Sequence, residues 1–241
     1  MPQVADGCTD VALMPMTHLR LYTGPLSMFG AKAEIALLEK AVDFDRIPVP
    51  FTDDRYQPKD PEVARVNPKG QVPVLIHGDV EVFDSTQIFE YLEDAFPVPP
   101  LWPATPAGRA EARQLELKSD EVFFPYIIKL MGLEATPNDP AAIAARDAAS
   151  RFYDEMEARL GTRRYLAGEF TYADIAFFMA QLFGERKGAL LAVTTPRLLA
   201  WRARMLERPP VRQVAARMAK WLASHGRPVP DYLLELLRQE S

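Results

Sequence analysis

The order of apolar and polar residues divides the chain into two halves with different patterns. The first half holds four short apolar runs with the length and residue types of strands, at 18–23, 44–49, 72–77 and 80–83. Residues 27–42 and 84–96 carry apolar side chains at helical spacing, and residues 60–66 read as a short helix or turn. We therefore expect strands and helices to alternate in the first half.

Local signals refine this order. Pro48 has no backbone N–H to donate, so the strand that contains it should lie at a sheet edge. Gly78-Asp79 separates two strands and is a hairpin signature. The resulting order, βαβ followed by ββα within residues 17–97, is that of a thioredoxin-like domain, which makes this half an α+β domain.

The second half, residues 105–241, follows the helical period. The expected helices cover 106–131, 140–160, 172–184, 195–206 and 209–223, and residues 232–237 could add one more. Thr171 and Asp174 have the spacing of a capping box before the apolar run IAFFMA, which predicts a buried central helix. Proline crowds residues 98–104, so we expect an extended linker before an all-helical C-terminal domain.

Composition and charge narrow the function classes. The chain has 241 residues and a net charge of −5, which argues against a nucleic-acid binder that relies on a basic surface. Its 1 cysteine, Cys8, excludes a disulfide framework within one chain, and the histidines lack metal-ligand spacing. Residues 1–16 show no secretory signal and are expected to be a poorly ordered tail, and no stretch is apolar enough to span a membrane. We therefore expect a metal-free protein of the reducing cytoplasm.

Four segments, in this order and spacing, resemble the cytosolic glutathione S-transferase family. They are LYTGPLSMFGAKAEIALLEK, NPKGQVPVL, FDSTQIFEYLEDAFP and LAGEFTYADIAFF. The resemblance covers residues 18–224 and is to serine-type members, similar to those of plants and bacteria. It implies a thioredoxin-like domain that binds glutathione, followed by an all-helical domain.

Ser27 lies between the first expected strand and helix, where serine-type members carry the hydroxyl that hydrogen-bonds the glutathione sulfur. By that resemblance Ser27 is the catalytic residue. A thiol with an ordinary pKa of about 8.5 must become a thiolate near neutral pH, and a helix N-terminus favours the anion. Serine is also a common N-cap, so a purely capping role is the alternative. Tyr22 and Thr23 are rival hydroxyls, and a packing role suits Tyr22 better.

The resemblance also implies where the rest of the tripeptide binds. Val72 and Pro73 would form a cis peptide bond at the sheet edge, where Val72 pairs with the cysteinyl backbone. Ser85, at a helix N-terminus, would bind the γ-glutamyl carboxylate, and Asp84 would bind the ammonium group. The alternatives are a trans proline on an edge strand and a simple helix cap at 84–85.

Two further contacts and a co-substrate pocket follow from the same resemblance. Gln71 matches a glutathione-contacting glutamine. Lys59 would pair with the glycine carboxylate, although Pro58 stands where relatives often have a histidine; a solvated surface lysine is the alternative. The residues expected to line an apolar pocket for the electrophile are Phe123, Phe124 and Tyr126, since they lie near a helix-distorting proline. Aromatic residues at helical spacing are otherwise core.

Together these residues predict a glutathione transferase of the detoxification type. The bound thiolate attacks an electrophilic carbon of a small apolar co-substrate, so glutathione is a substrate and no cofactor is implied. The family is usually homodimeric, and the lack of cysteine at position 27 argues against a protein-thiol redox cycle. The alternatives are a glutathione-dependent disulfide or peroxide reductase on the same site, and a non-catalytic glutathione-binding or scaffold protein of this fold.

Overall fold

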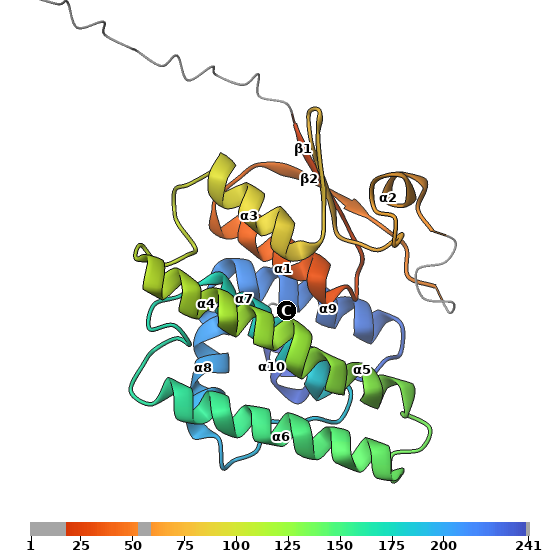
Figure 1. The fold of residues 1–241 in the computed structure, drawn as a ribbon. Coiled ribbons are helices and arrows are strands. Elements are labelled where there is room, and N and C mark those ends of the chain that lie inside the picture. Colours follow the sequence, from red (N-terminus) through yellow and green to blue (C-terminus); the bar gives the residue numbers. More distant parts are fainter. Residues whose placement is uncertain (1–17, 53–58, 240–241) are drawn as a thin grey trace, which may run out of the picture.

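The structure, a computed structural model, describes residues 18–52 and 59–239. The tail predicted at residues 1–16, which includes Cys8, lies outside the described residues. In the described part, a sheet with its helices comes first and helices alone follow (Figure 1). The predicted fold class is therefore confirmed.

Strands and helices alternate in the N-terminal half. The strands are β1 (Leu19–Thr23), β2 (Phe44–Pro48), β3 (Val74–His77) and β4 (Val80–Phe83), and the helices are α1 (Met28–Glu39), α2 (Pro61–Val66) and α3 (Ser85–Ala95). The sheet order is β2-β1-β3-β4, with β1 parallel to β2 and antiparallel to β3. The strand that contains Pro48 lies at the edge, as predicted, and Gly78 turns the β3–β4 hairpin with a φ of 60°.

The sheet builds a core on each of its faces, because successive side chains of a strand point in opposite directions. Leu21 and Leu75 join the main core together with residues of α1 and α3. Tyr22 and Val74 are the sequence neighbours of these two residues, so they point to the other face of the sheet. There they join Val63 of α2 in a smaller core. Tyr22 therefore packs, as expected, and α1 and α3 lie between the sheet and the C-terminal helices (Figure 1).

The C-terminal half is helical in the part that the structure describes. Its elements are α4 (Pro106–Lys118), a π-helical segment η1 (Ser119–Phe123), α5 (Phe124–Gly132), α6 (Pro140–Leu160), α7 (Tyr172–Arg186), α8 (Pro196–Glu207), α9 (Pro209–Ser224) and α10 (Asp231–Gln239). The helix predicted over 106–131 thus contains a π-helical turn, in which the Phe124 N–H donates to the Ser119 carbonyl. Pro125 follows this turn and has no N–H, which explains a distortion here.

The α7 helix is the buried centre of this half, as the run IAFFMA predicts; residues 172–184 are all buried. Asp174 accepts hydrogen bonds from the backbone N–H groups of Thr171 at 3.0 Å and Leu166 at 2.9 Å, and from the Trp201 indole at 2.9 Å. The capping box is therefore present, and it also ties the loop before α7 to α8.

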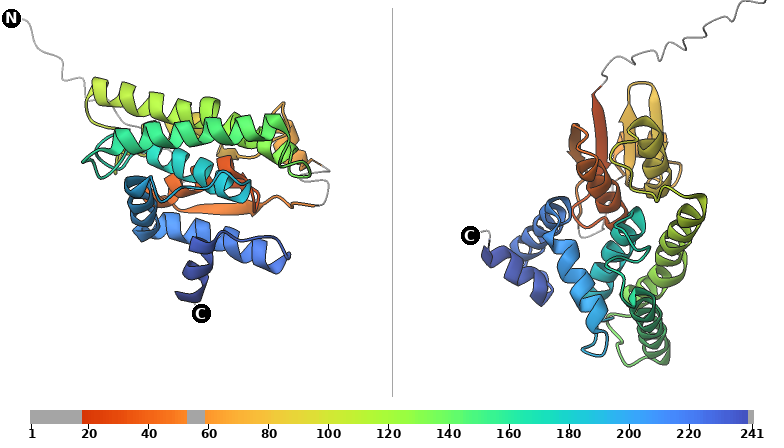
Figure 2. Two further views of the ribbon diagram at one scale, coloured as in Figure 1. Left: turned by 90° about the horizontal axis from the view of Figure 1, so that it is seen from below. Right: turned by 90° about the vertical axis from the view of Figure 1, so that its left-hand side faces the viewer.

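The C-terminal segment forms the extra helix that was expected beyond the helical core. α10 packs on α9, on the side that faces away from the sheet (Figure 2), and buries Leu233 and Leu236. Across residues 18–52 and 59–239, no helix has both the length and the apolar character needed to cross a membrane.

Candidate functional site

A pocket of about 350 Å³ lies between the N-terminal half and the α4–η1 helix. We name it the α3–α4 pocket. Its lining residues come from α1, the loop before β3, the start of α3, and α4–η1: Phe29, Asn67, Lys69, Gln71, Val72, Pro73, Phe83, Asp84, Ser85, Thr86, Gln87, Glu116, Leu117, Asp120 and Glu121. The structure thus brings together most of the residues predicted to bind glutathione.

The loop before β3 forms one wall of this pocket. The peptide bond between Val72 and Pro73 is cis, as predicted. Asn67 is buried, and its side chain donates to the Gln71 carbonyl at 2.7 Å and accepts the Lys69 N–H at 3.0 Å. Asn67 therefore holds this loop in one shape and leaves the exposed Gln71 side chain at the pocket. The motif NPKGQVPVL contained Asn67, but its positioning role was not predicted.

The start of α3 forms the wall opposite α4. Asp84 is the N-cap, and its Oδ1 accepts the N–H groups of Thr86 at 3.0 Å and Gln87 at 3.3 Å. Its φ of 73° lies in the left-handed region, where a non-glycine residue costs about 1–3 kcal/mol and often marks a ligand site. The Ser85 carbonyl accepts the Tyr172 hydroxyl at 2.9 Å, whereas the Ser85 hydroxyl is buried and has no partner among the described residues. Asp84 therefore caps the helix, and Ser85 has a hydroxyl hydrogen left for a ligand.

The lysine that lines the α3–α4 pocket is Lys69. Lys59 is exposed, and its side-chain carbons lie 3.2–3.4 Å from the position that a Cβ on Gly70 would occupy. Lys59 thus crosses the loop at Gly70, next to Lys69. Pairing of Lys59 with a glycine carboxylate stays a prediction, and Lys69 is the residue that sequence reasoning missed at this place.

Ser27 is the N-cap of α1, and its Oγ accepts the Gly30 N–H at 2.9 Å. A hydroxyl that accepts one hydrogen bond still has its own hydrogen to donate, so capping and sulfur binding do not exclude each other. The close packing requires glycine at position 30, because a Cβ there would stand 2.1 Å from Thr23 Oγ1 and 3.0 Å from Ser27 Oγ. The role of Ser27 toward sulfur stays a prediction.

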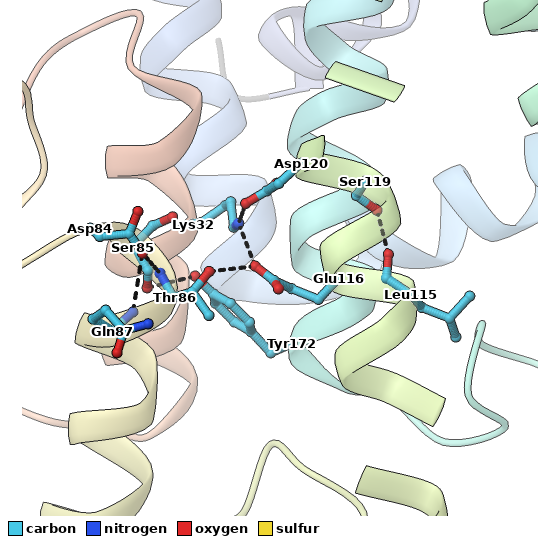
Figure 3. Close-up of polar contacts among 10 residues, drawn as sticks. All are labelled: Lys32, Asp84, Ser85, Thr86, Gln87, Leu115, Glu116, Ser119, Asp120 and Tyr172. Atoms are coloured by element: carbon cyan, nitrogen blue, oxygen red, sulfur yellow. Dashed lines mark hydrogen bonds and ion pairs between the residues drawn. The ribbon is translucent and has the colours of Figure 1, made fainter. Parts of the chain in front are cut away.

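A buried ion cluster in the wall of the α3–α4 pocket was not predicted; Figure 3 shows its side chains. The Lys32 ammonium group contacts Glu116 of α4 at 3.0 Å and also contacts Asp120 of η1. Thr86 of α3 donates to the same Glu116 oxygen at 2.6 Å, and the ammonium group lies 5.2 Å from the centre of the Tyr172 ring. The cluster joins α1, α3, α4 and α7, so it fixes the pocket wall across both halves of the chain.

Two carboxylates share one ammonium group in this cluster. Burial raises the pKa of Asp120 to about 6; Lys32 opposes the rise and Glu116 adds to it. Burial by itself would lower the pKa of Lys32, but Tyr172, Asp120 and Glu116 together raise it above its ordinary value. Lys32 therefore stays charged at neutral pH, and Asp120 changes its charge in the weakly acidic range.

The wall on the α4 side is acidic. The charged residues that line the α3–α4 pocket, among those described, are Lys69, Asp84, Glu116, Asp120 and Glu121. Asp120 Oδ1 is buried and lacks a hydrogen-bond partner within the described ranges. The spacing of Glu116 and Asp120, four residues apart on one helix face, was the available signal. In the same ranges, no three His, Cys, Asp or Glu side chains gather as metal ligands do.

The three aromatic residues predicted to line an electrophile pocket have different surroundings in the structure. Phe123 has no exposed surface and packs against Phe152, with ring centres 5.1 Å apart. Phe123 therefore packs in the core, and its position at an electrophile pocket stays a prediction. Phe124 packs against Phe29, a lining residue of the α3–α4 pocket, with ring centres 4.7 Å apart and ring planes tilted by 44°, and Tyr126 is half-buried. For these two, the pocket role stays a prediction.

The fold and this pocket define a class of protein in which a thioredoxin-like domain faces an all-helical domain across a ligand site. Residues 21–100 match the model of the glutathione S-transferase N-terminal domain, and residues 117–209 match that of the glutathione S-transferase C-terminal domain. The chain therefore belongs to the glutathione S-transferase family.

Individual relatives agree with this assignment. Glutathione S-transferase 3 of Zea mays is 30% identical over 83% of this chain and 95% of its own length. A stringent starvation protein A homolog of Coxiella burnetii is 31% identical over 67% of this chain and 74% of its own. A glutathione S-transferase of Methylobacterium radiotolerans, solved in complex with glutathione sulfonate, is 27% identical, covers 82% of this chain and 94% of its own, and superposes with a TM-score of 0.70.

Proposed function

We propose that this chain is a glutathione transferase that binds the tripeptide in the α3–α4 pocket. The observation that carries the proposal is the Ser85 hydroxyl, which is buried at the N-terminus of α3 with no partner in the described part of the chain. The amide groups and dipole of a helix N-terminus favour a carboxylate at that place. The solved relative that binds glutathione sulfonate supports the same ligand. Glutathione is then a substrate, and the reaction needs no cofactor.

The γ-glutamyl end of glutathione carries a carboxylate and an ammonium group, and the two walls of the pocket offer a partner for each. Ser85 takes the carboxylate. Asp84 Oδ1 accepts two amides of α3, and we propose that the other Asp84 oxygen, together with the negative charge of Asp120, attracts the ammonium group. Gln71 and the Val72–Pro73 edge bind the cysteinyl backbone as an added strand.

Ser27 is proposed to stabilise the glutathione sulfur as a thiolate. Lowering the pKa of a thiol by one to two units takes about 1.4–2.7 kcal/mol. A hydrogen bond to a charged group contributes about 1.5–3 kcal/mol, so one hydroxyl donor is sufficient. The thiol proton leaves to water, the sulfur forms a bond to an electrophilic carbon, and the leaving group departs with its electron pair. Phe124 and Tyr126 are the proposed contacts of the apolar co-substrate.

The assembly and location are proposals as well. Large apolar side chains next to the α3–α4 pocket are exposed by 37% at Phe83, 55% at Leu117 and 42% at Val122. A second copy of the chain would cover them, so we propose a cytoplasmic homodimer, and light scattering should give twice the chain mass of 27.1 kDa. We propose domains at 17–97 and 105–241, joined by the linker 98–104.

Calorimetry with glutathione tests the ligand site. Ser85→Ala should weaken binding by about 10- to 100-fold, since a hydrogen bond to a charged group contributes about 1.5–3 kcal/mol. Asp84→Ala should also weaken it. Ser224→Ala, an exposed serine at the end of α9, is the matched control and should bind like the parent chain. Parent-like affinity in Ser85→Ala would reject the carboxylate site.

Two alternatives use the same ligand. A non-catalytic glutathione-binding or scaffold protein is favoured by the relative named as a stringent starvation protein A homolog, since that name states no transferase activity. A glutathione-dependent disulfide or peroxide reductase uses the same pocket and only the sulfur of glutathione. Turnover of an aryl halide supports the transferase, and turnover of hydroxyethyl disulfide alone supports the reductase. Firm glutathione binding without either turnover supports the non-catalytic binder.

A further inference from the structure

The hydroxyl group of Thr23, the last residue of β1, is buried without a hydrogen-bond partner in the described part of the chain. The residue is 1% exposed, and Oγ1 meets no donor or acceptor at hydrogen-bonding distance among the residues that the structure describes. The backbone of Thr23 is held in place, because its carbonyl accepts the Val49 N–H at 2.8 Å. A buried polar atom without a partner is uncommon and calls for an explanation. The hydroxyl hydrogen of Thr23 is therefore available for an acceptor.

Gly30 shows where this hydroxyl lies. A Cβ atom on Gly30 would stand 2.1 Å from Thr23 Oγ1 and 3.0 Å from Ser27 Oγ. Both oxygens thus lie around one point beside the first turn of α1, and the lack of a side chain at Gly30 makes room for them. The buried hydroxyl of Thr23 is therefore a close neighbour of the residue proposed to stabilise the glutathione sulfur.

Ser27 has room for the hydrogen bond that Thr23 can donate. A hydroxyl oxygen accepts two hydrogen bonds and donates one. Ser27 Oγ accepts the Gly30 N–H at 2.9 Å, so one lone pair and its own hydrogen remain. The hydroxyl groups of Thr23 and Ser27 are not hydrogen-bonded to each other in the structure. Hydrogen bonds of catalytic groups often shorten only when the substrate binds, and rotation about the Cα–Cβ bond of Ser27 moves its oxygen relative to Thr23.

We propose that Thr23 is a positioning residue for the transferase reaction: in the glutathione complex its hydroxyl donates to Ser27 Oγ, while Ser27 donates to the sulfur. With the Gly30 N–H and the Thr23 hydroxyl on its two lone pairs, Ser27 has only its hydrogen left, and that hydrogen points at the sulfur. Hydrogen bonds in such a chain polarise and strengthen one another. Thr23 therefore acts with Ser27 and not as its rival, and this inference rests on the proposed role of Ser27.

The alternative is that Thr23 only fills space beside Gly30. Valine has the same branched shape, with a methyl group in place of the hydroxyl. A buried hydroxyl without a partner costs free energy, so a packing role predicts that Thr23→Val leaves the bound thiol unaffected and the fold at least as stable. A hydrogen-bonding role predicts a change in the pKa of the bound thiol. One substitution therefore separates the two roles.

The thiolate absorbance of bound glutathione, followed against pH in the ultraviolet, tests the proposal. Thr23→Val should raise the pKa of the bound thiol by about half a unit, and turnover with an aryl halide below that pKa should fall about threefold. Thr23→Ser keeps the hydroxyl and should keep the parent pKa. Thr195→Val is the matched control, because Thr195 is also buried but donates to the Ala192 carbonyl at 2.8 Å in the helical half. If Thr23→Val fails to fold by circular dichroism, Thr23→Ala replaces it.

Ser27→Ala separates this inference from the proposed function. We expect Ser27→Ala to raise the pKa of the bound thiol, and adding Thr23→Val should have no further effect, because Thr23 acts through Ser27. A parent-like thiol pKa in Thr23→Val beside a raised one in Ser27→Ala would overturn the role of Thr23 alone. Additive effects in the double variant would overturn it too. A parent-like thiol pKa in Ser27→Ala, or no binding of glutathione, would overturn both proposals.

Discussion

The α1 helix carries two buried charges of opposite sign, two residues apart, that face opposite sides of the molecule. Lys32 meets two carboxylates in the wall of the α3–α4 pocket, and Glu34 meets the guanidinium groups of Arg46 and Arg217 on the side of α1 that faces β2 and α9. Each buried charge is thus outnumbered two to one by its partners. A buried charge is tolerated only when it is paired, and the second partner leaves each cluster with a net charge of the partners' sign.

The two clusters differ in their access to water. The side chains of Glu116 and Asp120 are 7% and 12% exposed, whereas those of Arg46 and Arg217 are 24% and 38% exposed. The cluster of Lys32, Glu116 and Asp120 is therefore less exposed to water, so its charges affect stability and pKa values more strongly. The cluster of Arg46, Arg217 and Glu34 is more exposed to water, so its surplus charge lowers the free energy of unfolding less. The following predictions test this contrast, from the largest expected effect to the smallest.

Lys32→Met should give the largest effect. Removing one member of a buried ion cluster costs about 3–5 kcal/mol in the free energy of unfolding, because its partners stay buried without a counter-charge. Urea unfolding at pH 8 measures the loss. At pH 5 the loss should be smaller, because protonation of Asp120 then relieves the repulsion between the two acids.

The matched control for this variant is Lys118→Met, in the same helix as Glu116 but 45% exposed. An exposed ion pair contributes about 0–1 kcal/mol, so little change is expected. Glu34→Gln should cost less than Lys32→Met, since both arginine partners reach water. Equal losses in Lys32→Met and Glu34→Gln would contradict the proposed difference in hydration.

Ser27→Ala comes next, because Ser27 caps the helix that carries Lys32 and Glu34. We expect turnover with an aryl halide to fall about 100-fold while glutathione affinity changes little, the pattern of a group that acts on the transition state. Thr105→Ala is the matched control: Thr105 caps α4 by accepting the Gly108 N–H at 3.1 Å, and losing a cap should not change turnover. Unchanged turnover in Ser27→Ala would move the role to another hydroxyl.

The smallest effect concerns the pH dependence of glutathione binding. The pKa of Asp120 is raised to about 6, so Asp120 is mostly protonated at pH 5 and mostly ionised at pH 7. Only the ionised form attracts an ammonium group, so glutathione affinity should rise by up to about tenfold between pH 5 and pH 7. Asp120→Asn should flatten this profile in a calorimetric titration, and an unchanged profile would exclude Asp120 as the partner.

The same shift affects folding. Because the pKa of folded Asp120 lies above its ordinary value of 3.8, the folded state holds a proton that the unfolded state releases. Stability should therefore fall as pH rises from about 4 to 6, the range in which folded Asp120 loses this proton. Asp120→Asn should remove the contribution of Asp120 to this decrease in the free energy of unfolding, as measured by urea unfolding at several pH values.

Patterns within a short stretch of sequence predicted much of the fold. The edge position of β2 followed from Pro48, the buried α7 from its apolar run, and the capping role of Asp174 from its spacing to Thr171. The ion cluster could not be predicted in this way, since Lys32 lies 84 residues from Glu116 in the sequence. Only the packing of α1 and α4 against the same helix, α7, brings them together.

Residues 123–126 show a second limit of sequence reasoning. Helical periodicity assumes a constant rotation from one residue to the next. The π-helical turn just before Phe124 breaks that assumption, so the sequence did not show which ring would be core. Phe123 turned inward and Phe124 turned toward α1, against Phe29.

The π-helical segment η1 has one consequence for the orientation of everything that follows it. A π-turn holds one surplus residue relative to an α-turn, which rotates the downstream helix by about 100°. The length of the stretch Ser119–Phe123, and not only its composition, therefore aims the Phe124 ring at Phe29. A protein that lacked a single residue here would keep a straight helix and the same side chains, yet would present a different surface to α1.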